Sequence, residues 1–149
     1  MAGTEIDIPD LTPPISHYAH AVRAGDFVFI SGMVALDRHG NVLAPGDAVQ
    51  QTRHTLEAIR RVLVRVGATF ADIVKVTVYV KDMKDRPRIN PVRQEFFGSA
   101  RPASTLVEVS DLAVPGLLVE IDAVAHVPAR RRRPARRAVR RRGVARRSR

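Results

Sequence analysis

The chain has 149 residues, no cysteine and a formal net charge of +10. The excess charge lies in residues 128–149, which contain 12 arginines and no acid, so residues 1–127 carry a formal charge of −2. These features exclude a disulfide framework and thiolate catalysis, disfavour a basic nucleic-acid surface on the folded body, and favour a single domain. The N-terminus lacks the apolar segment of a signal peptide, and no apolar run could span a bilayer. A cytoplasmic protein without membrane contact is therefore expected.

The first part of the chain predicts a lead-in followed by a hairpin. Residues 1–14 contain three prolines and are predicted to be irregular. Residues 16–22 and 27–36 are extended runs on either side of a turn at Gly25-Asp26, which is a hairpin signal. Ser31-Gly32 interrupts the second run. A glycine there indicates a bulge or the close approach of a ligand or another backbone.

Residues 47–66 give the clearest helix. Apolar side chains and one threonine recur at steps of three and four, at Val49, Thr52, Leu56, Ile59, Leu63 and Val66. Asp47 is placed to cap the helix, with Gln50 three residues later to complete a capping box. Gly67 follows where a left-handed terminating residue belongs.

Residues 72–80 are rich in β-branched side chains and predict a central strand. A second helix follows, with Asn90 as its cap, Pro91 at its first position and Gly98 at its end. An earlier start near Asp85 is the alternative, and it would place Pro91 inside the helix as a kink.

Two alternating runs end the folded part, separated by Pro115-Gly116. In the second run Val119 and Ile121 share one face, whereas Glu120 and Asp122 share the other. A charge within an apolar run is costly without a partner. Glu120 is therefore interpreted either as an outward-facing strand residue or as a functional carboxylate.

The element order β-β-α-β-α-β-β predicts an α+β fold in which two helices cover one face of a mixed sheet. The other face is then left uncovered, which predicts oligomerisation. Residues 128–149 are predicted to be a disordered arginine-rich tail that binds polyanions non-specifically. The five histidines are scattered, so no metal site is expected, and Ser31 has no recognisable triad partners.

The ordered set of segments across residues 15–127 closely resembles the Rid (YjgF-type) family, whose members are also called L-PSP endoribonucleases or translation initiation inhibitors. The set comprises SHYAHAVRAGDFVFISGMVAL, GDAVQQT, GATFADIVKVTVYVKDM, INPVRQEFFG, RPASTLVEVSDL and LLVEIDAVA. The resemblance implies a Rid-type domain with a chorismate-mutase-like fold, a homotrimer, and small-molecule clefts between subunits. It also implies hydrolysis of enamines or imines to carbonyl compounds and ammonia, with no cofactor.

The same resemblance implies a set of site residues. Tyr18, Ser31-Gly32 and Asn90 match positions that line the family's cleft, and Glu120 matches the acid that orients the attacking water. Backbone groups of Thr105 or Leu106 are expected to hold the substrate carbonyl.

Ser104 stands where deaminases of the family carry an arginine that pairs with the substrate carboxylate. A serine offers a neutral hydrogen bond and no charge. Arg101 alternates to the opposite face and could supply the cation only if Pro102 bends the strand. Arg93 or Arg23 could supply it from another direction. The departure indicates a substrate other than 2-aminoacrylate, with aminomuconate-like compounds as one class. Two alternatives stay open: a non-catalytic ligand-binding trimer, and RNA binding or cleavage.

Overall fold

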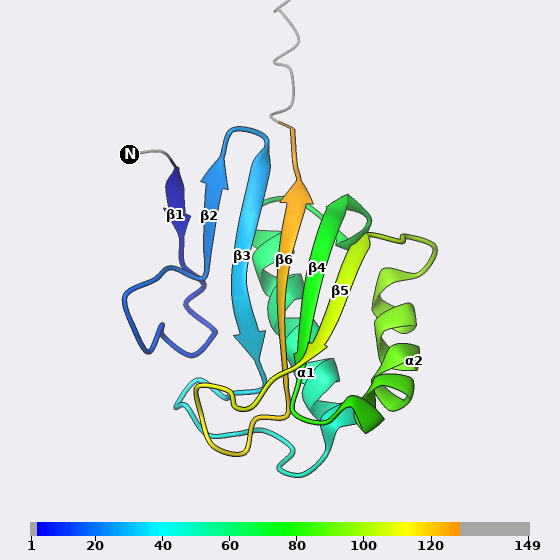
Figure 1. Cartoon of the computed structure of the whole chain (residues 1–149). Coiled ribbons are helices and arrows are strands. Elements are labelled where there is room, and N and C mark those ends of the chain that lie inside the picture. Colours follow the sequence, from blue (N-terminus) through cyan, green and yellow to red (C-terminus); the bar gives the residue numbers. More distant parts are fainter. Residues whose placement is uncertain (1–2, 129–149) are drawn as a thin grey trace, which may run out of the picture.

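The computed structural model describes residues 3–128, which form one mixed six-stranded sheet with two helices on one of its faces (Figure 1). The strands lie in the order β1-β2-β3-β6-β4-β5, and only β4 and β5 run parallel. Their bounds are β1 Thr4–Ile6, β2 Ala21–Ala24, β3 Phe27–Val34, β4 Ile73–Val80, β5 Ala103–Glu108 and β6 Val119–His126; the helices are α1 Ala48–Arg65 and α2 Arg86–Phe97. Short 3-10 helices at Phe70–Asp72 and Met83–Asp85 precede β4 and α2.

The predicted first helix is confirmed as α1. The Asp47 carboxylate accepts hydrogen bonds from the backbone N–H groups of Val49 and Gln50, both at 3.0 Å, which satisfies two of the free donors of the first turn. The expected capping box is wrong, because the Asp47 N–H that it would use donates instead to the carbonyl of Ala44. Gly67 follows the helix with φ of 73°, as predicted.

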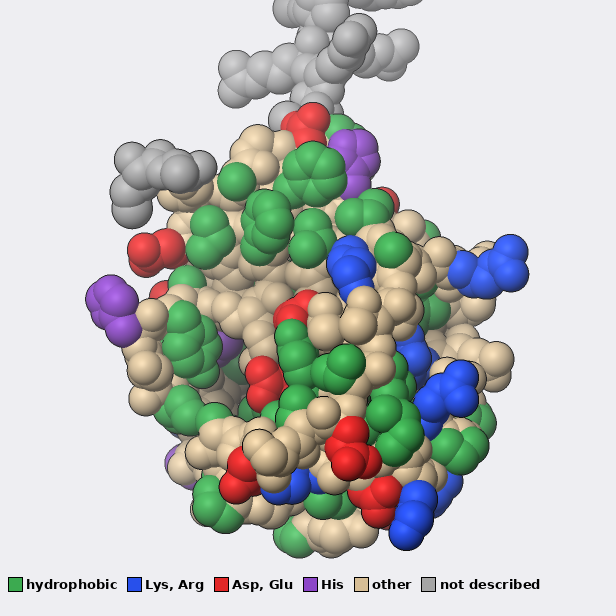
Figure 2. Space-filling view, viewed as in Figure 1, with side chains coloured by type: hydrophobic (Ala, Val, Ile, Leu, Met, Phe, Trp, Pro, Cys, Tyr) green, Lys and Arg blue, Asp and Glu red, His purple; other side chains and the backbone are tan. Residues whose placement is uncertain are grey.

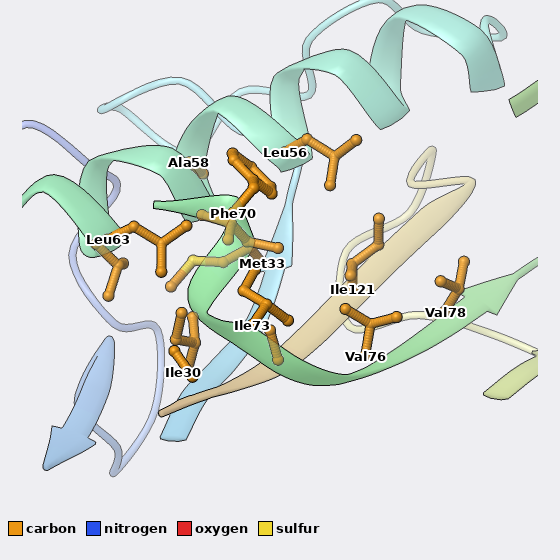
Figure 3. Close-up of a cluster of buried hydrophobic side chains, with 14 of the residues drawn as sticks. Ile30, Met33, Leu56, Ala58, Leu63, Phe70, Ile73, Val76, Val78 and Ile121 are labelled. Atoms are coloured by element: carbon orange, nitrogen blue, oxygen red, sulfur yellow. The ribbon is translucent and has the colours of Figure 1, made fainter. Parts of the chain in front are cut away.

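The core lies between the sheet and the helices (Figure 3). Alternate residues of β3, β4 and β6 point into it, and they meet the apolar stripe of α1. Leu56 and Ile59 of α1 are fully buried, as are Val78 of β4 and Ile121 of β6, which is 1% exposed. Burying each such side chain contributes roughly 1.5–3 kcal/mol. This packing fixes which side chains of β6 point away from the helices, including Glu120.

No helix or strand within residues 3–128 covers the opposite face of the sheet. Phe27 and Phe29 are 43% and 49% exposed there, and Val107 of β5 lies on the same side. Figure 2 shows hydrophobic side chains gathered over this face, with acidic side chains near its middle. The uncovered face predicted from the element order is therefore present.

Two parts of the sequence interpretation need correction. Residues 1–14 are not irregular throughout, because Thr4–Ile6 pair antiparallel with β2 ahead of the prolines. Residues 16–20 are not extended, and β2 begins only at Ala21.

Asn90 does not cap the second helix, which begins at Arg86 and contains Pro91 in its interior. The helical path starts earlier because Asp82 caps the preceding 3-10 helix, and because burying Ile89 requires a first turn before it. The helix ends at Gly98, with φ of 57°, as expected.

Candidate functional site

A pocket of about 410 Å³ opens beside the middle of β3. One wall is the loop before β2, another is the loop between β5 and β6, and the carboxylate of Glu120 projects in from β6. The lining is mainly apolar; the residues are Leu11, Thr12, Pro13, Ile15, Ser16, Tyr18, His20, Ser31, Gly32, Met33, Val34, Leu36, Ala58, Ala113, Val114, Leu117 and Glu120. Such a volume and character suit a small organic ligand.

Glu120 is the only carboxylate among these lining residues, which include no lysine or arginine. Partial burial raises the pKa of the Glu120 carboxyl above its ordinary value, and the negative charge of Asp122 raises it further. A carboxyl in this condition keeps its proton to higher pH than a surface glutamate. A raised pKa brings a carboxyl closer to the range in which it can both donate and accept a proton during catalysis.

Gly32 makes room for that carboxylate. The pairing of β3 with β6 shifts register between Ile30 and Met33, which marks a bulge at Ser31-Gly32 as the sequence predicted. A Cβ atom on Gly32 would lie 2.8 Å from the carboxyl carbon of Glu120 and still closer to its Oε1. A side chain at residue 32 would therefore force the end of the Glu120 side chain to move aside.

Ser31 connects the bulge to the loop that forms the pocket wall. Its hydroxyl donates to the carbonyl of Ala19 at 2.7 Å, and its N–H donates to the carbonyl of His20 at 3.0 Å. The lone pairs of the Ser31 hydroxyl are the acceptors left for a ligand.

His20 also positions this wall of the pocket, a role that the scattered spacing of the five histidines did not predict. It is 5% exposed. Its Nδ1 accepts from the N–H of Ile8 at 3.1 Å and lies 3.4 Å from the Asp7 carboxylate, and its Nε2 lies 2.9 Å from the carbonyl of Thr12. The ring thereby fixes the segment that carries Leu11 and Pro13 into the pocket. Only the folded topology brings these partners together, so sequence spacing carries no signal for them.

Tyr18 stands at the rim of the pocket and is 46% exposed. Its phenolic oxygen accepts from the backbone N–H of Ile15 at 3.4 Å. Its hydroxyl proton is thus available to a ligand. Tyr18, Ser31, Gly32 and Glu120 form the group of predicted site residues that one chain assembles.

The other four predicted site residues lie outside this pocket. Ser104 faces α2, and its hydroxyl accepts from Arg93 Nη2 at 2.9 Å. Asn90 lies on the α2 stripe of Arg93, three residues away. Leu106 shares the face of Ser104 and packs against the core.

Thr105 lies on the uncovered sheet face instead, with its hydroxyl 2.8 Å from Lys75 Nζ. The predicted substrate-binding residues are therefore divided between the pocket and the β5–α2 edge of the molecule.

Arg93 is the cation of this second group. Partial burial lowers the pKa of its guanidinium, and the charge of Arg86 on the same helix stripe lowers it further. Among the described residues no salt bridge to Arg93 is formed, whereas Arg53 pairs with Glu95 at 2.7 Å and Arg88 pairs with Asp85 at 2.7 Å. Arg23, the other candidate, donates to the carbonyl of Val127 at 3.0 Å.

Within residues 3–128, no cluster of three or more histidine, cysteine, aspartate or glutamate side chains is placed to hold a metal ion. No helix in that same range has the length and apolar character that crossing a membrane requires. The arginine-rich tail lies outside the described residues, apart from Pro128.

Comparison with known proteins agrees with the fold and covers almost all of it. Residues 10–127 match the family model described as Endoribonuclease L-PSP. A RutC family protein of Pyrococcus abyssi is 39% identical over 85% of this chain and 98% of its own length. The 3-aminoacrylate deaminase RutC of Acinetobacter baylyi is 40% identical over 83% of this chain and 98% of its own.

Solved structures give the same result. A Rid family protein of unknown function from Yersinia pestis, YyfA, superposes with a TM-score of 0.79 at 30% identity, over 85% of this chain and 100% of that one. A putative endoribonuclease of Thermotoga maritima gives a TM-score of 0.78 at 30% identity, over 85% and 98%.

Proposed function

Because the chain belongs to the Endoribonuclease L-PSP family, which includes the Rid and RutC proteins, we propose that it hydrolyses an enamine or imine to a carbonyl compound and ammonia. The observation that carries this proposal is the partly buried Glu120 carboxylate, which projects into an apolar pocket whose lining includes no lysine or arginine. The relative from Acinetobacter baylyi, named as a 3-aminoacrylate deaminase, supports the same class of reaction.

The chemistry needs a group that moves protons at a water molecule. A proton from solvent adds to the enamine carbon to give an iminium ion, and water then adds to the iminium carbon. Glu120 takes the proton from the attacking water and returns it to the departing nitrogen. Ammonia leaves as the hydroxyl proton of the carbinolamine returns to solvent, which gives the carbonyl compound. The raised pKa of Glu120 favours its part as a proton donor as well as an acceptor. No step draws on a metal or a cofactor.

We propose that the complete site is formed between the subunits of a homotrimer. Two features support this: the uncovered apolar sheet face, and the separation of the predicted site residues into two groups. The second group, at Asn90 and Ser104, would reach the pocket of a neighbouring subunit, with backbone groups of Thr105 and Leu106 at the substrate carbonyl.

Arg93 replaces the cation that is missing at Ser104 in this proposal. Its guanidinium lies at the Ser104 hydroxyl and forms no salt bridge within residues 3–128. A guanidinium binds a carboxylate through two parallel hydrogen bonds, so the substrate class is an enamine or imine that carries a carboxylate. A pocket of about 410 Å³ also admits 3-aminoacrylate, which is an isomer of 2-aminoacrylate, and larger aminomuconate-like compounds.

The test is ammonia release by the full chain over a panel of enamines and imines generated in the assay. Glu120→Gln keeps the size of the side chain but cannot take a proton, so turnover should fall at least 100-fold while the oligomer mass stays unchanged. Unchanged turnover in this variant would refute the role of Glu120.

A non-catalytic ligand-binding trimer is the second candidate, and Ser104 in place of the family arginine favours it. In that case no substrate of the panel releases ammonia, yet small carboxylates bind the pocket in both the parent and Glu120→Gln. RNA binding or cleavage is the third. RNA affinity that disappears on deletion of residues 128–149 would assign it to the tail and not to the folded domain.

A further inference from the structure

Two acidic side chains stand next to each other on the uncovered face of β6. Strand alternation puts Glu120 and Asp122 on the same side, two residues apart. Tyr79 of β4 lies directly across from Glu120, and its hydroxyl reaches along the sheet to donate to Asp122 Oδ2 at 2.9 Å. Asp122 is absent from the lining of the pocket that Glu120 enters.

The hydrogen bond from Tyr79 has two effects on Asp122. The donated hydrogen bond fixes the position of the Asp122 carboxylate, and it occupies one lone pair of Oδ2. The same contact raises the pKa of the Tyr79 hydroxyl, so the tyrosine stays a neutral donor throughout the physiological range. Asp122 is therefore a stationary negative charge beside Glu120.

The other polar groups around Glu120 do not offset that charge. From the N-terminal loop, the His20 ring has Nδ1 at the N–H of Ile8, with the Asp7 carboxylate 3.4 Å away, and Nε2 at the carbonyl of Thr12. Tyr18 from the same loop and Ser31 from β3 are neutral hydroxyl groups.

From β4 and β5, a cation does lie on the same sheet face. Lys75 directs its Nζ to the carbonyl of Val76 and the hydroxyl of Thr105, both at 2.8 Å, and forms no salt bridge within residues 3–128. Lys75 of β4 pairs with Val124 of β6, whereas Thr77 pairs with Asp122 and Tyr79 pairs with Glu120. Lys75 is therefore farther from Glu120 along the sheet than Asp122 is. Besides partial burial, Asp122 is the charge within residues 3–128 that raises the pKa of the Glu120 carboxyl.

We infer that Asp122, held by Tyr79, is a positioning residue that sets the pH range over which Glu120 exchanges its proton. The inference rests on the proposed function for its catalytic meaning, but the electrostatic link between the two carboxylates is measurable without turnover. Asp122 and Tyr79 act on Glu120 from outside the lining of the pocket.

The experiment follows the carboxyl carbon of Glu120 by NMR in the full chain labelled with carbon-13 glutamate. The chain has five glutamates, and Glu120→Gln assigns the Glu120 signal by removing it. Asp122→Asn deletes the charge but keeps an oxygen that can accept from Tyr79. It should lower the titration midpoint of Glu120 by about one pH unit. Glu57→Gln, on α1 behind the sheet, removes a charge on the helix side and should leave that midpoint in place.

A second readout is the pH profile of ammonia release. If Glu120 is the base, its acidic limb should move to lower pH in Asp122→Asn by the same amount as the NMR midpoint. Tyr79→Phe frees Asp122 to move, so the Glu120 midpoint should fall by less than in Asp122→Asn. An unchanged NMR midpoint in Asp122→Asn would overturn the inference. A shifted midpoint in a protein that releases no ammonia would uphold the inference and refute the proposed function.

Discussion

The carboxylate of Glu120 occupies the space in which a side chain at residue 32 would stand. A Cβ on Gly32 would come within 2.8 Å of the Glu120 carboxyl carbon, a distance that real Cβ atoms do not reach. The bulge at Ser31-Gly32 in β3 therefore provides the space that the Glu120 carboxylate of β6 occupies.

Gly32→Ala should displace the Glu120 carboxylate without unfolding the domain. Rotating the side chain away moves the carboxylate by on the order of 1 Å, and misplacement of that size can lower turnover about 100-fold. The added methyl group should also destabilise the fold by about 1–3 kcal/mol. Kinetics and urea unfolding measure the two effects. In the background of Glu120→Gln the same substitution should cause little further loss of turnover, and a full additional loss would contradict the link.

Glu120 should make the protein less stable as pH rises. Its pKa in the folded state lies above the ordinary value of 4.5, so the folded state binds this proton more tightly than the unfolded state. Stability from this group is complete below about pH 4 and is lost as pH rises through the raised folded pKa, by roughly 1.4 kcal/mol for each unit of pKa shift. The free energy of unfolding of Glu120→Gln, relative to that of the parent, should therefore be higher at pH 8 than at pH 4.

Urea unfolding at both values, at one protein concentration, provides the measurement. Glu57→Gln is the matched control, since it removes an acid from α1 on the other side of the sheet. A Glu120→Gln variant with the same pH dependence as the parent would contradict the raised pKa.

The regular elements followed from local signals, whereas the misassigned ones depended on tertiary contacts. The Asp47 cap, the α1 stripe and the alternation of β6 are each legible in a few neighbouring residues. The strand Thr4–Ile6 has no such pattern and exists because β2 offers it a partner. Asn90-Pro91 has the composition of a helix start, but the helix begins earlier, at Arg86, and includes the buried side chain of Ile89.

The sequence predicted individual residues of the candidate site, but not the contacts that bring them together. Alternation placed Glu120 away from the core, and the glycine in β3 marked a close approach. Neither could reveal that the approaching group is Glu120 itself, because that contact joins residues 88 positions apart in sequence. The role of His20 was hidden for the same reason, since its partners Ile8 and Thr12 meet it only through the folded loop.

Arg93→Gln should weaken binding of carboxylate-bearing substrates. Removing a charge-assisted hydrogen bond costs about 1.5–3 kcal/mol, which corresponds to a rise in KM of roughly 10- to 100-fold with little change in kcat. Arg88→Gln on the same helix is the matched control, because Arg88 is paired with Asp85. Steady-state kinetics with one carboxylate substrate and its amide analogue give the comparison. Equal KM values in Arg93→Gln and the parent would exclude Arg93 as the carboxylate partner.

Phe29→Asp should dissociate the proposed trimer. Phe29 is 49% exposed in one chain and lies on the sheet face that carries Phe27 and Val107. Burial of such side chains against neighbouring subunits would drive assembly, and a buried unpaired carboxylate would oppose it strongly. Val64→Asp is the matched control, since Val64 is 70% exposed on α1, on the helix side of the sheet.

Sedimentation at micromolar concentration should give a trimer mass for the parent and Val64→Asp, and a monomer mass for Phe29→Asp. The monomer should also lose turnover, because Arg93 and Glu120 of one chain belong to separate groups that only neighbouring subunits bring together. A parent protein that sediments as a monomer, or a monomeric Phe29→Asp with full turnover, would show that one chain holds the complete site.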